Sequence, residues 1–150
     1  MQVPCPVYIF DFDGVLIDSE GEPRRVGVEA LRQAAGMGRV YILSGRPPRD
    51  RGKVLGVLRS LGVLAVVEDV ILGRGRGVPE EEYKYERALE ILSTEGCILE
   101  VHDDNPRVLD RLSRLARGGL VLHYNGHCTP VRGHTTIQVC REARGRHGMI

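Results

Sequence analysis

Short apolar runs alternate with longer amphipathic stretches along almost the whole chain. The short runs are rich in Val, Ile and Leu, which is typical of strands that are buried on both faces of a sheet. These runs predict strands at residues 7–10, 40–43, 63–67 with 70–72, 97–101 and 120–122, and a further edge strand at 135–140.

The stretches between these runs repeat their apolar residues at helical spacing and carry helix start and stop signals. Helices are predicted at residues 23–35, 50–61 and 79–92, and from 105 to the Gly118-Gly119 pair. Asp50 and Asn105 are the expected N-caps of two of them. Strands that alternate with helices indicate a parallel sheet covered on both faces, and such sheets bind ligands at the carboxyl ends of their strands.

Polar side chains follow three of the predicted strands at that edge. Asp11 and Asp13 follow the first strand, Ser44 begins the segment after the second, and Asp103 and Asp104 end the fourth. Two carboxylates two residues apart on a strand share a face and repel each other unless a cation neutralises them. The pattern therefore indicates a site for a divalent cation and, with it, phosphate chemistry.

Four segments resemble the four motifs of the haloacid dehalogenase (HAD) superfamily of phosphatases and phosphotransferases, in that family's order. They are DFDGVLID at 11–18, ILSGRP at 42–47, Lys84, and VHDD at 101–104. The resemblance implies an α/β fold of three layers, Rossmann-like, with a mostly parallel sheet and helices on both faces. It also implies a phosphomonoester hydrolase that works through an aspartyl-phosphate.

The resemblance assigns a role to each motif residue. Asp11 is the expected nucleophile, and Asp13 is the expected acid that protonates the leaving oxygen and then the base for water. The substrate phosphate is expected to bind Ser44, Gly45, Arg46 and Lys84.

A Mg²⁺ cofactor is expected to neutralise the charge of the nucleophile and the phosphate. Its expected ligands are the Asp11 carboxylate, the backbone carbonyl of Asp13, and a carboxylate of Asp103 or Asp104. The sequence leaves open which of the last two is the direct ligand.

The chain of 150 residues is predicted to form one domain, residues 1–150. Many HAD enzymes insert a cap domain between these motifs. Only 30 residues separate Asp13 from Ser44, and 39 separate Ser44 from Lys84, and the predicted elements need most of them. We therefore expect no cap domain and an open site, or a lid that is supplied by oligomerisation.

The Ser-Gly-Arg of the second motif resembles the phosphatase domains of polynucleotide kinase-phosphatases and related RNA-repair proteins. This predicts a phosphorylated substrate such as a nucleotide or a nucleic-acid end. Arg49, Arg51, Arg74 and Arg76 either contact a nucleic-acid backbone or form a solvated surface. Two alternatives stay open: a noncatalytic module that binds phosphate or RNA ends, and a small-metabolite phosphatase or phosphotransferase.

The net charge and the length of the apolar runs bear on the expected partners and cellular location. A net charge of +1 gives no overall basic field for nucleic acid, although 19 arginines stand against 2 lysines. No apolar run approaches the roughly 20 residues of a membrane span, and no signal peptide is evident, so a cytoplasmic location without a membrane partner is expected.

The cysteines and histidines near the end of the chain suggest no metal site. No pair of the four cysteines has C-x-x-C spacing, so reduced thiols are expected, with Cys97 as a small core residue. The spacing of the histidines and cysteines between 123 and 140 matches no standard structural zinc pattern. The basic tail at 141–150 is predicted to fray.

Overall fold

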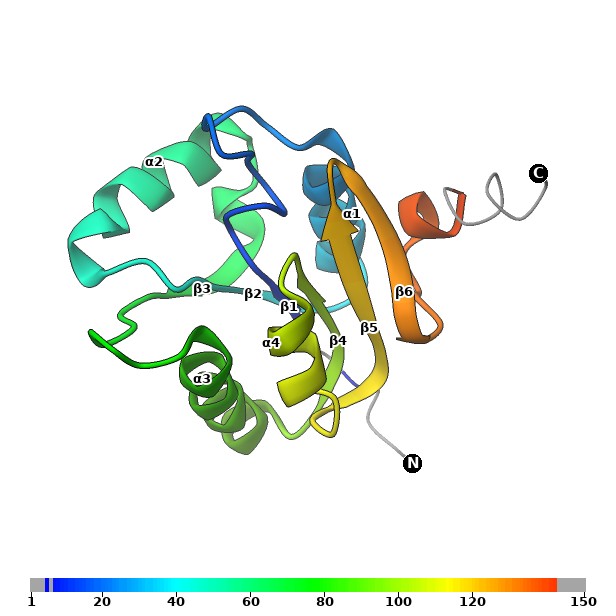
Figure 1. The fold of residues 1–150 in the computed structure, drawn as a ribbon. Helices are drawn as coiled ribbons and strands as arrows, with labels where there is room; N and C mark the ends of the chain where they lie inside the picture. The colour runs from blue at the N-terminus through cyan, green and yellow to red at the C-terminus, as the bar shows by residue number, and fades with distance from the viewer. Residues whose placement is uncertain (1–4, 6, 143–150) are drawn as a thin grey trace.

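A six-stranded sheet with helices on both faces forms the computed structural model, which describes residues 5 and 7–142 (Figure 1). Its strands are β1 (Val7–Phe10), β2 (Arg39–Leu43), β3 (Val67–Ile71), β4 (Ile98–Asp103), β5 (Ala116–Tyr124) and β6 (His127–Gly133). They are ordered β3-β2-β1-β4-β5-β6, with β6 antiparallel to β5 and all other pairs parallel. This confirms the predicted α/β class with a mostly parallel sheet.

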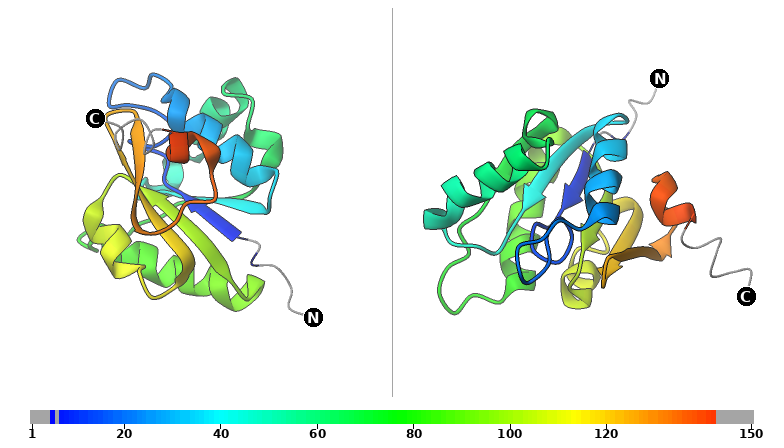
Figure 2. Two further views of the ribbon diagram at one scale, coloured as in Figure 1. Left: turned by 90° about the vertical axis from the view of Figure 1, so that its right-hand side faces the viewer. Right: turned by 90° about the horizontal axis from the view of Figure 1, so that it is seen from above.

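A helical segment at residues 138–142 packs on one face of the sheet, and four further helices cover the two faces (Figure 2). They are α1 (Arg25–Ala35) and α2 (Arg51–Ser60) on one face, and α3 (Glu80–Glu95) and α4 (Pro106–Arg111) on the other. The alternation of side chains along β1 joins the two cores, because Tyr8 and Phe10 pack towards α1 while Val7 and Ile9 pack towards α3. Short 3₁₀ turns at Pro48–Asp50 and Leu64–Val66 precede α2 and β3.

The strand order reverses direction between β1 and β4. From β1 the chain adds β2 and then β3 on one side, and it returns to add β4 and β5 on the other. Such a switch point leaves a crevice at the carboxyl ends of the two central strands. The Asp11 N–H donates to the His102 carbonyl across this junction at 2.9 Å, so the residues that end β1 and β4 are held side by side.

The segment from β1 to α1 is a compact loop. Asp13 forms a bridge with Ile17, and Ile17 forms another with Pro23. Regular elements occupy the segment from Ser44 to Lys84. Within residues 7–142 neither segment contains an inserted cap domain, as the spacing of the motifs predicted.

Two helix ends differ from the sequence prediction. Asp50 makes no side-chain capping bond at α2, and its carboxylate lies 3.5 Å from Arg46. The helix that Asn105 caps ends at Arg111, well before Gly118-Gly119, which lies within β5. A Cβ at Gly118 would come within 2.7 Å of the Leu99 side chain, so this glycine allows close strand packing rather than stopping a helix.

The edge strand also lies earlier than predicted. Asn125 and Gly126 have φ values of 50° and 81°, which suits the tight turn of a hairpin and places β6 at His127–Gly133. Residues 135–137 form no strand, and 138–142 are helical. The prediction rested on the apolar pattern alone and did not use the Asn125-Gly126 turn signal, which starts the edge strand at His127.

The cysteines are paired, so the prediction of reduced thiols is wrong. Cys5 bonds to Cys97, and Cys128 bonds to Cys140. Disulfides occur mainly in oxidising compartments and in intracellular proteins of hyperthermophiles, so the pairs lend no support to the cytoplasmic location expected from the sequence. The described helices include none with the length and apolar character to cross a bilayer. The predicted frayed tail falls mostly on residues 143–150, outside the described part.

Candidate active site

A cavity of about 380 Å³ opens at the carboxyl ends of β1, β2 and β4. It is lined by Asp11, Asp13, Gly45, Arg46, Pro47, Arg74, Glu80 and Asp104. The structure thus brings most of the motif residues to one cavity. The others, Ser44, Lys84 and Asp103, are almost fully buried close to it.

Three carboxylates meet at the β1–β4 junction. Asp11, Asp103 and Asp104 each offer an oxygen, and these oxygens lie within 4.8 Å of one another. Backbone groups orient two of them: the Phe12 N–H donates to Asp11 Oδ1 at 2.8 Å and the Asn105 N–H to Asp103 Oδ1 at 2.9 Å. A cluster of hard oxygen donors fits Mg²⁺. The Asp13 carboxylate is not in this cluster, and the predicted role of its backbone carbonyl stays a prediction.

Lys84 is buried beneath the carboxylates. Its side chain is 1% exposed, and Nζ lies 3.0 Å from Asp11 Oδ1, 2.7 Å from Asp103 Oδ2 and 2.9 Å from Glu80 Oε1. Burial by itself lowers the pKa of Lys84, but the negative charges of Asp11, Asp103 and Glu80 outweigh it and raise this pKa above its usual range. The ammonium group therefore stays charged at any physiological pH.

The single positive charge of Lys84 does not neutralise the carboxylates around it. Burial, followed by the charge of Asp103, raises the pKa of Asp11 well above its usual range in spite of Lys84. Burial likewise raises the pKa of Asp103 to about 6, although Lys84 opposes the rise. Asp11, Asp103, Asp104 and Glu80 face a single lysine, and this excess of negative charge is what a bound divalent cation relieves.

Asp13 lies in a different environment from Asp11. Its side chain is 49% exposed, and Arg46 grips it with Nε–Oδ2 and Nη2–Oδ1 distances of 2.9 and 2.8 Å. The hydrogen bond to Asp13 is the main cause that raises the pKa of Arg46. The Arg46 guanidinium also lies over the Phe12 ring, 5.3 Å from its centre. The two motif aspartates therefore have unequal partners, as their unequal predicted roles require.

Ser44 and Gly45 form the turn after β2. Ser44 is fully buried, and its hydroxyl accepts the Arg46 N–H at 3.1 Å. This contact shapes the turn that points Arg46 towards Asp13, and Ser44 does not line the cavity. The predicted hydrogen bond from Ser44 to a substrate phosphate stays a prediction, whereas Gly45 lies at the cavity wall.

Two charged cavity residues, Glu80 and Arg74, were not among the predicted site residues, and Pro47 was not either. Glu80 binds Lys84 and accepts a hydrogen bond from Asn105 Nδ2 at 3.4 Å. The i, i+4 spacing of Glu80 and Lys84 was the available signal, but it is equally typical of a surface pair. Arg74 also lines the cavity, whereas Arg51 donates to the Val70 carbonyl at 2.8 Å and holds α2 against β3.

Gly14 leaves room for the Asp104 carboxylate. Its φ is +82°, and a Cβ there would lie 2.1 Å from Asp104 Oδ2. We expect Gly14→Ala to displace this carboxylate and to weaken Mg²⁺ binding roughly tenfold or more, measured by calorimetric titration.

Gly21→Ala is the matched control for Gly14→Ala. Gly21 has a φ of +84°, but a Cβ there would meet no atom within 4 Å. An alanine at either position adopts the same unfavourable positive φ, so the two variants share the backbone strain. Only Gly14→Ala is expected to change Mg²⁺ affinity. Equal affinities in the two variants would show that Asp104 does not hold the metal.

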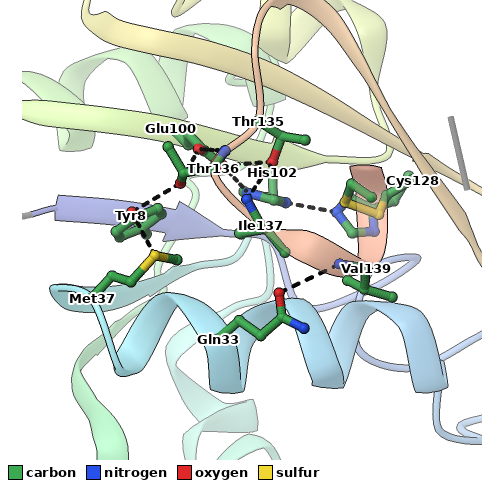
Figure 3. Close-up of polar contacts among 12 residues, drawn as sticks. Tyr8, Gln33, Met37, Glu100, His102, Cys128, Thr135, Thr136, Ile137 and Val139 are labelled. Carbon is green, nitrogen blue, oxygen red and sulfur yellow. Dashed lines mark hydrogen bonds and ion pairs between the residues drawn. A yellow bond between two sulfur atoms is a disulfide. The ribbon is translucent and has the colours of Figure 1, made fainter. Parts of the chain in front are cut away.

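A second polar network lies behind the site, on the α1 face of the sheet (Figure 3). His102 Nε2 lies 3.0 Å from Glu100 Oε1, and His102 Nδ1 lies 2.8 Å from His123 Nε2. Thr135 and Thr136 donate to the Glu100 carboxylate from the segment that follows β6.

This network stabilises the strand ends that carry the acidic cluster. Burial lowers the pKa of His102 and lowers that of His123 further, so both rings are neutral near pH 7. The Phe10 ring stacks on His102 at 4.1 Å, directly before Asp11 and Asp103 in their strands. His123 Nε2 is thus occupied by His102, and Cys128 is bonded to Cys140.

Comparison with known proteins shows the fold alone. No family model matches the chain, and no curated protein matches it either. A chain of the Pnkp1/Rnl/Hen1 RNA repair complex is similar with a TM-score of 0.62 and 20% identity over 75% of this chain. A protein described as a short-chain dehydrogenase/reductase from Sinorhizobium meliloti 1021 has a TM-score of 0.38 and 16% identity over 77% of this chain, which carries no argument. This chain covers 40% of the former and 50% of the latter.

Proposed function

We propose that the protein is a Mg²⁺-dependent phosphomonoester hydrolase that acts through an aspartyl-phosphate at Asp11. The observation that carries the proposal is the meeting of Asp11, Asp103 and Asp104 around a buried Lys84 at the topological switch point. Unaided hydrolysis of phosphate monoesters is extremely slow, so the site must stabilise much charge in the transition state. Lys84 and a bound Mg²⁺ supply positive charge there.

The contacts of Asp11 orient it for attack. We propose that Oδ2 makes the attack, because Lys84 and the Phe12 N–H both contact Oδ1. The Oδ2–phosphorus bond forms as the bond from phosphorus to the leaving oxygen breaks. Attack by water on the phosphorus then releases inorganic phosphate and regenerates Asp11.

Asp13 supplies and removes the proton in these two steps. In the structure Arg46 holds Asp13 through two hydrogen bonds. A phosphate in the cavity competes for the same guanidinium fork, which binds phosphate as well as carboxylate. When Arg46 turns to the phosphate, the half-exposed Asp13 carboxylate takes up a proton from solvent and gives it to the leaving oxygen, and it later takes a proton from the attacking water.

We infer that the substrates are the phosphorylated ends of nucleotides or polynucleotides. The Ser-Gly-Arg motif at 44–46 and the fold shared with a chain of an RNA repair complex support this class of substrate. The site has no cap domain over it within the described residues, and Arg74 at its wall adds positive charge. An uncapped site admits a large substrate, and Arg46 and Arg74 offer contacts for its phosphates.

A Mg²⁺-dependent substrate screen tests the proposal. Purified protein is assayed for phosphate release from p-nitrophenyl phosphate, mononucleotides and oligonucleotides with a 3′- or 5′-phosphate. We expect hydrolysis that EDTA abolishes and Mg²⁺ restores, with oligonucleotide ends preferred. Hydrolysis of mononucleotides but not of oligonucleotide ends would overturn the polynucleotide assignment. Tight binding of phosphorylated ends without turnover would show a noncatalytic module instead.

A further inference from the structure

A second cavity, of about 950 Å³, forms a groove along the outer face of α1. The end of α2, the β5–β6 turn at Gly126, and Val139 of the helical segment 138–142 border it. Figure 2 shows α1 between α2 and this helical segment. The proposed phosphatase mechanism uses no residue of the groove.

The groove is basic. Arg24, Arg25 and Arg32 line it, against the single acid Glu29. Arg32 Nη2 donates to the Leu61 carbonyl at 2.8 Å, which ties the far wall of the groove to α2. The first turn of α1 contains no acidic residue and no capping side chain that would neutralise the arginines.

Arg24 carries a donor that lacks an acceptor. Its Nε is buried and has no hydrogen-bond partner in the described structure. This nitrogen is closed to solvent, so a ligand with anionic oxygens would meet the guanidinium at its outer nitrogens, of which Nη1 lies beside Gly126 at the groove wall. Arginine binds phosphate through two donors at once, which makes phosphate groups the best match.

The groove begins close to the candidate active site. Asp13 lines the active-site cavity and Pro23 lines the groove, and the bridges Asp13–Ile17 and Ile17–Pro23 connect them. Each bridge joins backbones about 5 Å apart, so the two Cα atoms lie within roughly 10 Å of each other. Nucleotides in a helical strand advance by about 3.4 Å each, so a strand reaches from site to groove within a few nucleotides.

We propose that the α1 groove binds the phosphodiester backbone of a single polynucleotide strand whose phosphorylated end occupies the acidic site. This inference rests on the proposed function and adds to it a second, remote contact with the same substrate. The arginines recognise phosphates and not bases, so the contact is independent of sequence and weakens with salt.

The test compares substrates of different length. Wild type and the double variant Arg24→Ala/Arg25→Ala are assayed on p-nitrophenyl phosphate and on a dinucleotide and a dodecanucleotide with the same terminal phosphate. We expect kcat/KM of the double variant to fall roughly tenfold on the dodecanucleotide and to stay unchanged on the two short substrates. The salt dependence on the dodecanucleotide should also decrease, by about 0.7 in the logarithmic slope for each phosphate contact removed.

Arg114→Ala/Arg117→Ala is the matched control, because both side chains are exposed and neither lines the groove. It should behave as wild type on every substrate. Arg25→Glu alone, at an exposed position, keeps the test interpretable if the double variant fails to fold.

The outcomes separate this inference from the proposed function. If the double variant hydrolyses the dodecanucleotide as well as wild type does, the groove does not bind the strand, while the phosphatase assignment stands. If wild type hydrolyses nothing, the phosphatase assignment fails, and fluorescence anisotropy of a labelled dodecanucleotide decides on the groove. Equal affinity of wild type and the double variant in that measurement would overturn the inference.

Discussion

Replacing Asp11 by asparagine is expected to lower kcat for Mg²⁺-dependent phosphate release by about 10⁴-fold or more. The amide keeps the shape of the side chain but is a far weaker nucleophile than the carboxylate. It also withdraws one negative charge from the cluster that would hold the metal. The measurement is steady-state phosphate release from the best substrate of the screen, with and without Mg²⁺.

Asp18→Asn is the control for Asp11→Asn. Asp18 belongs to the same motif, but its exposed carboxylate accepts the Glu20 and Glu22 N–H groups and holds only the local loop. Its replacement should leave kcat unchanged. Full activity in Asp11→Asn would exclude Asp11 as the nucleophile and, with it, the aspartyl-phosphate mechanism.

Replacing Lys84 by methionine is expected to lower the free energy of unfolding by about 3–5 kcal/mol. The change removes the ammonium that contacts Asp11, Asp103 and Glu80, and within the described residues no other lysine pairs with the two buried aspartates. Methionine fills a similar volume, so a cavity contributes little to the loss. Urea denaturation at neutral pH, with and without Mg²⁺, measures the effect.

Mg²⁺ should restore part of the stability lost in Lys84→Met, because the ion replaces some of the missing positive charge near Asp11. Lys53→Met, at the other lysine of the chain, is the control. Lys53 is exposed on α2, and its replacement should change the free energy of unfolding by no more than about 0.5 kcal/mol. A loss below about 1 kcal/mol in Lys84→Met would mean that the carboxylates do not depend on this lysine for their charge balance.

If the buried carboxylates depend on Lys84 for their charge balance, this residue contributes to both stability and the proposed function. The same three carboxylate contacts that are expected to make Lys84 important for stability also place its charge beside the proposed nucleophile. If the acidic cluster binds Mg²⁺ as proposed, the ion should also stabilise the wild-type protein against unfolding.

The alternation of strands and helices along the chain was predictable from the sequence, and so was the position of the acidic residues at the carboxyl ends of the strands. Strand β1 has the predicted bounds, because four consecutive buried residues are a local signal. Asp11 and Asp103 end neighbouring strands, so the rule that parallel sheets bind ligands at their carboxyl ends placed them together without any knowledge of contacts. The Asn-Gly turn at 125–126 was a local signal too, but the strand pattern alone did not use it.

Contacts between residues far apart in the chain were decided only by the tertiary structure. The pairing of Arg46 with Asp13, the inward turn of Ser44 and the network around Glu100 each depend on which neighbours the fold supplies. The disulfide of Cys5 with Cys97 joins residues separated by 92 positions, which no spacing rule reveals. Periodicity and strand ends are properties of a few consecutive residues, whereas the partner of a charged or thiol group is set by packing across the whole domain. The sequence by itself therefore determined where the acidic residues gather, and the structure decided which partners balance their charge.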